Sequence, residues 1–255
     1  MKISVIQPDI IWNDKAGNLA RIERLIAGTD NPDLVILPEM FSTGFSERTE
    51  LFSEPPCSKT FEWIISLSEK NNYGLCGSYP VTEKDRFYNR WIFVTPERES
   101  WHYDKRHLFT MNEEEKAFTP GRKRVTFTFR GVRILPIVCY DLRFPVWSRN
   151  RNDYDLLIIS ANWPVARRDV WITLLKARAI ENQCYVAASN RIGTDGNKIE
   201  YCGESMIIDP YGEILASAYP DKECTISAEL SIDELAAFRK KFPVLKDADD
   251  FTLNP

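Results

Sequence analysis

The sequence has little of what a metal-binding or disulfide-stapled protein needs. Its 255 residues hold only two histidines, His102 and His107, and none of the six cysteines belongs to a Cys-x-x-Cys pair. Zinc sites and thioredoxin-like redox motifs depend on closely spaced cysteines and histidines. The sequence therefore predicts neither a metal site nor a redox motif of this kind.

Long apolar runs and a strong excess of one charge are also missing. No apolar stretch approaches the roughly 20 residues that a membrane helix needs. The opening stretch MKISVIQPDIIW lacks the apolar core and cleavage site of a signal peptide. A net charge of -4 gives no sign of the positive charge excess that is typical of proteins that bind nucleic acid or an anionic membrane. We therefore expect a reduced, cytoplasmic protein that binds neither nucleic acid nor membrane.

Short apolar runs alternate with amphipathic segments along the first part of the chain. Such alternation is typical of a layered α/β fold. The pattern predicts strands at 2–7, 33–37 and 73–79, helices at 13–27 and 58–71, and a hairpin of strands at 88–95 and 98–104.

The same order of elements then recurs in the second part of the chain. DLVILPE is echoed by DLLIISAN, and NYGLCGSYP by NQCYVAASN. We expect two similar half-units, each with a sheet and a pair of helices. The second half-unit is predicted to hold strands at 133–139, 155–160 and 184–189, helices at 145–151 and 167–182, and a hairpin at 204–216.

Each predicted sheet has helices on one face and an apolar second face left to bury. Packing these second faces together gives a four-layer α-β-β-α sandwich, formed as a single domain over residues 1–255. Two separate α/β domains are the alternative, but no linker-like segment lies near residue 130. The tail from Phe242 onward is expected to wrap another element or a partner subunit.

Three chemically useful side chains lie where predicted strands end. Glu39 follows DLVILP, Lys105 follows the second strand of the first hairpin, and Cys139 ends RILPIVC. Ligands of α/β proteins bind beyond the carboxyl ends of strands. Each residue also has a structural interpretation: Cys139 as a core residue, Glu39 as a strand-end acid or helix cap, and Lys105 as a surface cation. Spacing alone leaves open whether they meet.

Together the three groups suit acyl transfer from an amide or nitrile through a thioester. A carboxylate can take the proton of a thiol, whose reference pKa is about 8.5. A nearby ammonium favours the thiolate and can stabilise an oxyanion, with the backbone N–H of Tyr140 as a second donor. This chemistry needs no metal and no organic cofactor.

Longer motifs around these residues resemble those of the nitrilase, or carbon–nitrogen hydrolase, superfamily, over nearly the whole chain. The resemblance implies a Glu39-Lys105-Cys139 triad, the α-β-β-α sandwich and assembly into homodimers or larger homo-oligomers. The matching segments are LPEMFSTGF (37–45), YDKRHLF (103–109), CYDLRFPVWSRN (139–150), ANWPVARRDVW (161–171), ARAIENQCYVAASNRIGTDG (177–196) and YGEIL (211–215).

Within that superfamily the chain is most similar to the bacterial ω-amidases. The full CYDLRFPVWSRN segment and the short length, without an appended domain, carry this likeness. It implies a small-molecule amide substrate: a short ω-amido 2-oxo acid such as 2-oxoglutaramate or 2-oxosuccinamate. The products would be the dicarboxylic acid and ammonia.

The resemblance also implies a second glutamate beside the triad, shortly before the Pro120-Gly121 turn. Of the neighbours Glu113, Glu114 and Glu115, the alignment selects Glu114. It is expected to position Lys105 or the substrate amide, whereas the other two belong to a solvated acidic turn.

Four further residues are candidates for contacts with the substrate. Arg143 is predicted to meet the carboxylate of the substrate, with an ion pair to Asp141 as the alternative. Phe41, Tyr140 and Trp163 flank strand ends and are predicted to wall the site, although aromatic residues at such places are about as often ordinary core.

Three other functions compete with this interpretation. His107 or His102 can serve as the base of a Cys-His hydrolase. The chain can also be an inactive assembly or regulatory subunit. A third alternative keeps the Glu-Lys-Cys chemistry and changes the substrate to a nitrile, another amide, an N-carbamoyl amine or deaminated glutathione.

Overall fold

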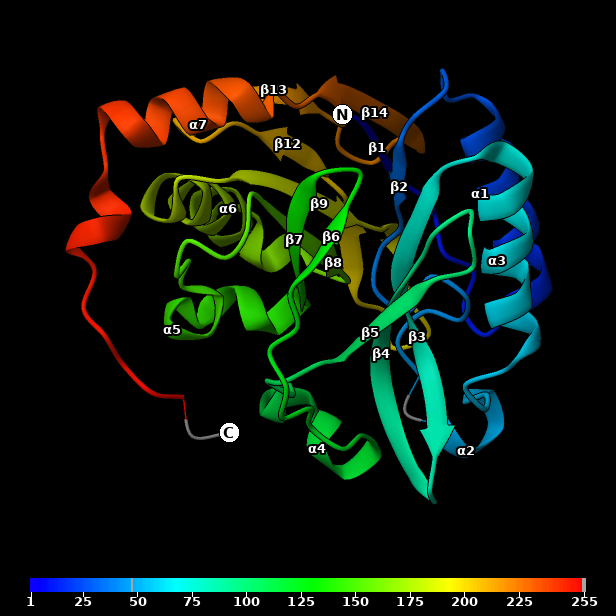
Figure 1. The fold of residues 1–255 in the computed structure, drawn as a ribbon. Coiled ribbons are helices and arrows are strands. Elements are labelled where there is room, and N and C mark those ends of the chain that lie inside the picture. Colours follow the sequence, from blue (N-terminus) through cyan, green and yellow to red (C-terminus); the bar gives the residue numbers. More distant parts are fainter. Residues whose placement is uncertain (47, 254–255) are drawn as a thin grey trace.

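In the computed structural model, which describes residues 1–46 and 48–253, two six-stranded sheets pack face to face between outer helices (Figure 1). The first sheet has the order β14 (Cys224–Glu229), β1 (Lys2–Gln7), β2 (Leu34–Ile36), β3 (Gly74–Glu83), β4 (Arg86–Val94) and β5 (Ser100–Asp104). The second has the order β6 (Phe127–Phe129), β7 (Val132–Val138), β8 (Leu156–Ala161), β9 (Tyr185–Asn190), β12 (Met206–Ile208) and β13 (Ile214–Ser217).

The two sheets repeat one pattern of strand pairing. In each, an antiparallel edge strand precedes three parallel strands, and two antiparallel strands follow. Strand β2 is therefore the equivalent of β8 in the repeat, and β3 is the equivalent of β9, as the paired sequence segments predicted. The fold class, a layered α/β sandwich of two similar half-units, is confirmed.

Helices cover the outer face of each sheet (Figure 1). Helices α1 (Lys15–Ala27) and α3 (Lys59–Asn71) lie on the first sheet, where Ile22, Ile26 and Ile64 enter its outer core. Their starts are capped by Asp14 and Ser58, whose side chains accept backbone N–H bonds. The second sheet carries α5 (Pro145–Ser148) and α6 (Arg168–Asn182), and α7 (Ile232–Lys241) follows β14.

Shorter elements complete the chain and were not predicted, nor were α7 and the edge strands β6 and β14. Strand β6 has only three residues and β14 is largely half exposed, so their apolar pattern is weak. The remaining elements are the helices α2 (Thr49–Phe52) and α4 (Glu114–Ala117), the two-stranded ribbon of β10 (Ile192–Thr194) and β11 (Glu200–Cys202), and 3₁₀ helices at Thr110–Asn112, Cys139–Arg143, Val165–Arg167 and Val244–Asp247.

The main core lies between the sheets and brings their strand ends into register. Trp91 on β4 is fully buried there and donates from Nε1 to Ser160 Oγ on β8 at 3.2 Å. Ser160 Oγ in turn donates to the carbonyl of Leu37, 2.7 Å away, just beyond β2. These bonds cross from one half-unit to the other, so the carboxyl ends of β2 and β8 face the same region.

The C-terminal tail packs on its own chain. Arg151 donates to the carbonyl of Phe251 at 3.1 Å, and its guanidinium lies 4.4 Å from the centre of the Phe251 ring. Figure 1 shows this segment, in red, running down the outer side of the second half-unit. The predicted wrapping of another element is thus observed. No helix in residues 1–46 and 48–253 is both long and apolar enough to cross a membrane.

We expect Trp91→Ala to lower the free energy of unfolding by about 3–5 kcal/mol, because it opens a cavity between the sheets and leaves Ser160 without a donor. Urea denaturation followed by circular dichroism measures this change. The control is Tyr219→Ala, which removes a side chain that is 73% exposed and should change stability by less than about 0.5 kcal/mol. Equal effects of the two substitutions would contradict this account of the core.

Candidate active site

Cys139 lies one residue beyond β7, where the backbone turns sharply into a 3₁₀ helix. Its φ of 45° is a left-handed conformation that residues other than glycine adopt uncommonly. The fully buried Asp141 stabilises this turn by accepting from the N–H of Val138 at 3.0 Å and from the hydroxyl of Tyr103 at 2.7 Å. The turn ends the strand at Val138, not at Cys139, and holds the thiol at the carboxyl edge of the sheet.

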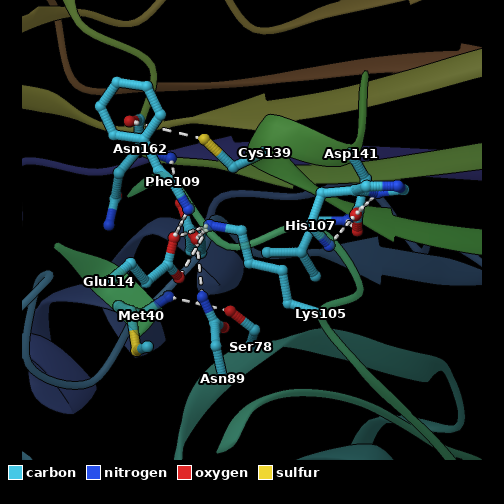
Figure 2. Close-up of polar contacts among 12 residues, drawn as sticks. Met40, Ser78, Asn89, Lys105, His107, Phe109, Glu114, Cys139, Asp141 and Asn162 are labelled. Carbon is cyan, nitrogen blue, oxygen red and sulfur yellow. Dashed lines mark hydrogen bonds and ion pairs between the residues drawn. The ribbon is translucent and has the colours of Figure 1, made fainter. Parts of the chain in front are cut away.

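A buried ammonium stands between two carboxylates near this thiol (Figure 2). Lys105 Nζ donates to Glu39 Oε1 and to both carboxylate oxygens of Glu114, each at 2.9 Å. All three side chains are at most 2% exposed. Lys105 is therefore no surface cation and Glu39 no solvent-facing acid, so those alternatives are wrong.

The Glu39 carboxylate receives hydrogen bonds from both half-units. Asn89 on β4 donates from Nδ2 to Oε1 at 2.7 Å, and the backbone N–H of Asn162, just beyond β8, donates to Oε2 at 2.9 Å. Glu114 is held similarly, because the N–H of Phe109 donates to its Oε2 at 2.6 Å. Among the three neighbouring glutamates, Glu114 alone is buried, whereas Glu113 pairs with Lys116 at the surface.

Burial and charge decide the protonation states in this cluster. Burial would lower the pKa of Lys105, but Glu114 and Glu39 outweigh it and hold that pKa well above its usual value. Burial, followed by the charge of Glu39, raises the pKa of the Cys139 thiol well above its usual value, against a smaller lowering by Lys105. The ammonium of Lys105 favours the thiolate, as expected, but burial and the charge of Glu39 outweigh it and favour the protonated thiol.

A cavity of about 330 Å³ opens onto these groups. This volume suits a small molecule. Its wall joins residues from both half-units: Glu39, Lys105, Glu114 and Cys139 with Phe45, Phe109, Tyr140, Arg143, Asn162, Trp163, Arg167, Ile199 and Tyr201, and a rim that includes Met111 and Asn112.

Two guanidinium groups line the cavity without an acidic partner in the described part of the chain. Arg143 lies over the Trp163 ring at 5.0 Å, and Arg167 lies over the Phe109 ring at the same distance. Such cation–π contacts hold a guanidinium in place without neutralising it. The alternative pairing of Arg143 with Asp141 is absent from the ion pairs of residues 1–46 and 48–253.

Phe41 is not part of the cavity, so its prediction as a wall residue is wrong. It is fully buried on the helix side of the first sheet, with its ring 5.9 Å from that of Trp63 and 6.0 Å from that of Tyr79. The turn after Pro38 sends Glu39 into the site and Phe41 away from it. Phe45, from the same motif, lines the cavity instead.

Sequence reasoning also missed Phe109, Asn162, Arg167 and Tyr201 as cavity residues. The first three lie inside the motifs YDKRHLF and ANWPVARRDVW, which were the available signal. Tyr201 comes from β11, a short strand with no such signal.

His107 lies outside this cavity. Its Nδ1 is 2.7 Å from Asp141 Oδ1, and its ring stacks on Phe144 with centroids 3.8 Å apart. It lines a separate hollow with Arg106 and Leu253. His102 is exposed on β5. This geometry counts against either histidine as the base for Cys139.

A thiol, a carboxylate with tightly fixed oxygens and a buried ammonium are the parts of a cysteine hydrolase that uses no histidine. No group of three or more metal-ligating side chains is arranged to hold a metal ion among the residues described.

Comparison with known proteins agrees with this class. Residues 2–240 match the model of the Carbon-nitrogen hydrolase family, and the chain belongs to that family. Omega-amidase YafV of Escherichia coli K12 is 44% identical over 253 residues, which cover 99% of this chain and 98% of that protein. The 2-oxoglutaramate amidase of Bacillus subtilis is 34% identical over 252 residues, 96% of each chain.

Solved structures give the same result. A CN-hydrolase superfamily protein from Xanthomonas campestris, with an arsenic adduct in its active site, has a TM-score of 0.96 and 39% identity, covering 100% of this chain and 99% of that one. Nit3 of Saccharomyces cerevisiae, a member of the nitrilase superfamily, has a TM-score of 0.88 and 27% identity, covering 96% and 94%. The resemblance to the nitrilase superfamily is confirmed, and the protein is an enzyme of the carbon–nitrogen hydrolase type.

The raised pKa of the Cys139 thiol predicts slow alkylation of the free enzyme at neutral pH. Because the thiolate is the reactive form, the rate of carbamidomethylation by iodoacetamide should keep rising as the pH passes through 9. Mass spectrometry of the peptide that contains Cys139 measures the rate, with circular dichroism at each pH as a control for folding. A rate that levels off below pH 8 would instead indicate a resident thiolate.

Proposed function

We propose that the protein is an ω-amidase that hydrolyses the terminal amide of short ω-amido 2-oxo acids, with 2-oxoglutaramate and 2-oxosuccinamate as the leading substrates. The observation that carries this proposal is the Arg143 guanidinium, which has no acidic partner among the described residues and lines the cavity that also holds Cys139. A carboxylate is its natural partner. The names of the Escherichia coli and Bacillus subtilis relatives support the same substrate class.

In the proposed mechanism, Cys139 Sγ attacks the amide carbon while its proton passes to Glu39. Lys105 Nζ and the Tyr140 N–H bind the oxyanion of the tetrahedral intermediate. Glu39 then returns the proton to the amide nitrogen, the C–N bond breaks, and ammonia leaves. A thioester remains on Cys139.

Hydrolysis of the thioester repeats these steps with water. Glu39 takes a proton from the water as the water oxygen attacks the thioester carbon. The C–S bond then breaks, and Glu39 returns the proton to Cys139, which leaves as the thiol. The product carries a carboxylate where the amide stood. Glu114 acts through Lys105, because its two oxygens keep the ammonium charged and in place.

Charge in the cavity favours an anionic substrate. Three cations (Lys105, Arg143, Arg167) and two carboxylates (Glu39, Glu114) line it, and 3 − 2 leaves one positive charge. Both carboxylates bind Lys105, so the two guanidinium groups are free to meet the acid end of the substrate. Tyr140 and Trp163 wall the space between these ends.

The proposed setting follows from the sequence. All six cysteines are free thiols, which fits a reducing compartment such as the cytoplasm. Action as a single domain over residues 1–255 is supported by β14, which closes the first sheet from the far end of the chain. Assembly into a homodimer or larger homo-oligomer stays a prediction from the family resemblance.

We expect the wild-type enzyme to release ammonia from 2-oxoglutaramate, and Cys139→Ala to release none above background. Arg143→Gln should raise KM at least tenfold, because a charge-assisted bond to the carboxylate is lost. A coupled ammonia assay measures both, with Arg151→Gln as the control that removes an equal charge outside the cavity. Activity confined to an N-carbamoyl amine, a nitrile or deaminated glutathione would support the Glu-Lys-Cys mechanism and contradict the proposed substrate class. A folded protein without any activity would favour the inactive-subunit alternative.

Replacing His107 by Ala tests the Cys-His alternative. We expect kcat to fall less than about tenfold, because general-base catalysis is worth roughly 10²–10⁴-fold and His107 lies outside the cavity. Glu39→Gln, assayed beside it, should lose essentially all activity. The opposite ranking of these two variants would assign the base role to the histidine.

A further inference from the structure

The carboxamide of Asn162 is a buried polar group with no partner among residues 1–46 and 48–253. The residue is 7% exposed, yet neither its Oδ1 nor its Nδ2 makes a hydrogen bond within this part of the chain. Buried polar groups in proteins are nearly always hydrogen-bonded, so each exception calls for an explanation. The nearby Asn190 shows the usual state, since its carboxamide accepts from the Trp163 N–H and donates to two carbonyls.

The backbone of Asn162 places this carboxamide at the reacting end of the cavity. Its N–H donates to Glu39 Oε2 at 2.9 Å, and its carbonyl lies 3.7 Å from Cys139 Sγ (Figure 2). Asn162 lines the cavity together with Arg143. A carboxamide in this place without a partner among the described residues calls for a ligand that satisfies it.

The chemistry of the proposed substrate leaves one group for Asn162 to meet. The amide of a short ω-amido 2-oxo acid is matched by Lys105, Glu39 and the Tyr140 N–H, and its carboxylate by the guanidinium groups of Arg143 and Arg167. The 2-oxo oxygen, which lies between those two ends of the substrate and can only accept a hydrogen bond, is left without an assigned donor. Nδ2 of Asn162 is a buried donor without a partner among the described residues, and Asn162 lines the cavity that would hold this oxygen.

We infer that Asn162 is the specificity-determining residue that donates from Nδ2 to the 2-oxo oxygen of the substrate. The inference rests on the proposed function and deepens it. A site that reserves a buried donor for one oxygen disfavours the analogue without that oxygen, because the donor then stays unpaired. The enzyme should therefore prefer 2-oxoglutaramate to glutaramate, which has a methylene in place of the 2-oxo group.

The test compares kcat/KM for 2-oxoglutaramate and glutaramate in the wild type and in Asn162→Leu, a substitution of similar volume that removes the donor. We expect the ratio of the two values to fall by about tenfold to a hundredfold in the variant, with glutaramate hydrolysis little changed. Asn71→Leu is the matched control, because it makes the same chemical change at an exposed position of α3 outside the cavity and should leave the ratio unaltered.

Other outcomes separate the inference from the proposed function. A wild type that hydrolyses neither amide overturns the proposed function. An unchanged ratio in Asn162→Leu, or no wild-type preference for the 2-oxo substrate, overturns the inference and leaves the amidase intact. Equal loss on both substrates in a folded variant also overturns it, because the carboxamide would then serve the reaction in general; Asn162→Ala provides the same comparison if Asn162→Leu does not fold.

Discussion

The pairing of one buried ammonium with two buried carboxylates is the constraint on which the rest of the site depends. A charge in the interior costs several kcal/mol unless it is paired with good geometry. Lys105 meets this requirement only if the loop after β2, the end of β5 and the start of α4 are all in place, because Glu39 and Glu114 come from different segments. The cluster therefore ties three distant pieces of the chain to one point. Burial, and after it the charge of Glu39, raises the pKa of the Cys139 thiol, so in the proposed mechanism proton transfer accompanies the attack.

The sheet-on-sheet packing explains why these segments meet at all. Hydrogen bonds from Ser160 to the Leu37 carbonyl and from Ser189 to the Ile6 carbonyl, each 2.7 Å long, link the central strands of the two half-units. The carboxyl ends of β2, β7 and β8 thus open onto one cavity. The two halves repeat the same pairing pattern but present different chemistry at these ends: Glu39 from the first, and Cys139 with Asn162 from the second.

How well the elements could be predicted depended on burial. The central strands β2, β7 and β8 are almost entirely buried, and their apolar runs marked them clearly. The edge strands β6 and β14 are short or half exposed, so they carried little signal. At the site, the choice of Glu114 over its neighbours came from family resemblance. The expectation for Phe41 failed because a turn two residues upstream sends its side chain into the core between the first sheet and its helices.

The sequence by itself determined the class of fold, the repeat of two half-units and the candidate catalytic side chains, because these depend on apolar periodicity and on motifs local in the chain. Only the tertiary structure decided which groups are buried together. The protonation of Cys139, the unpaired state of Arg143 and the unpartnered carboxamide of Asn162 all depend on neighbours that lie far away along the chain. Burial and electrostatic pairing act through space, so no local pattern of residues specifies them.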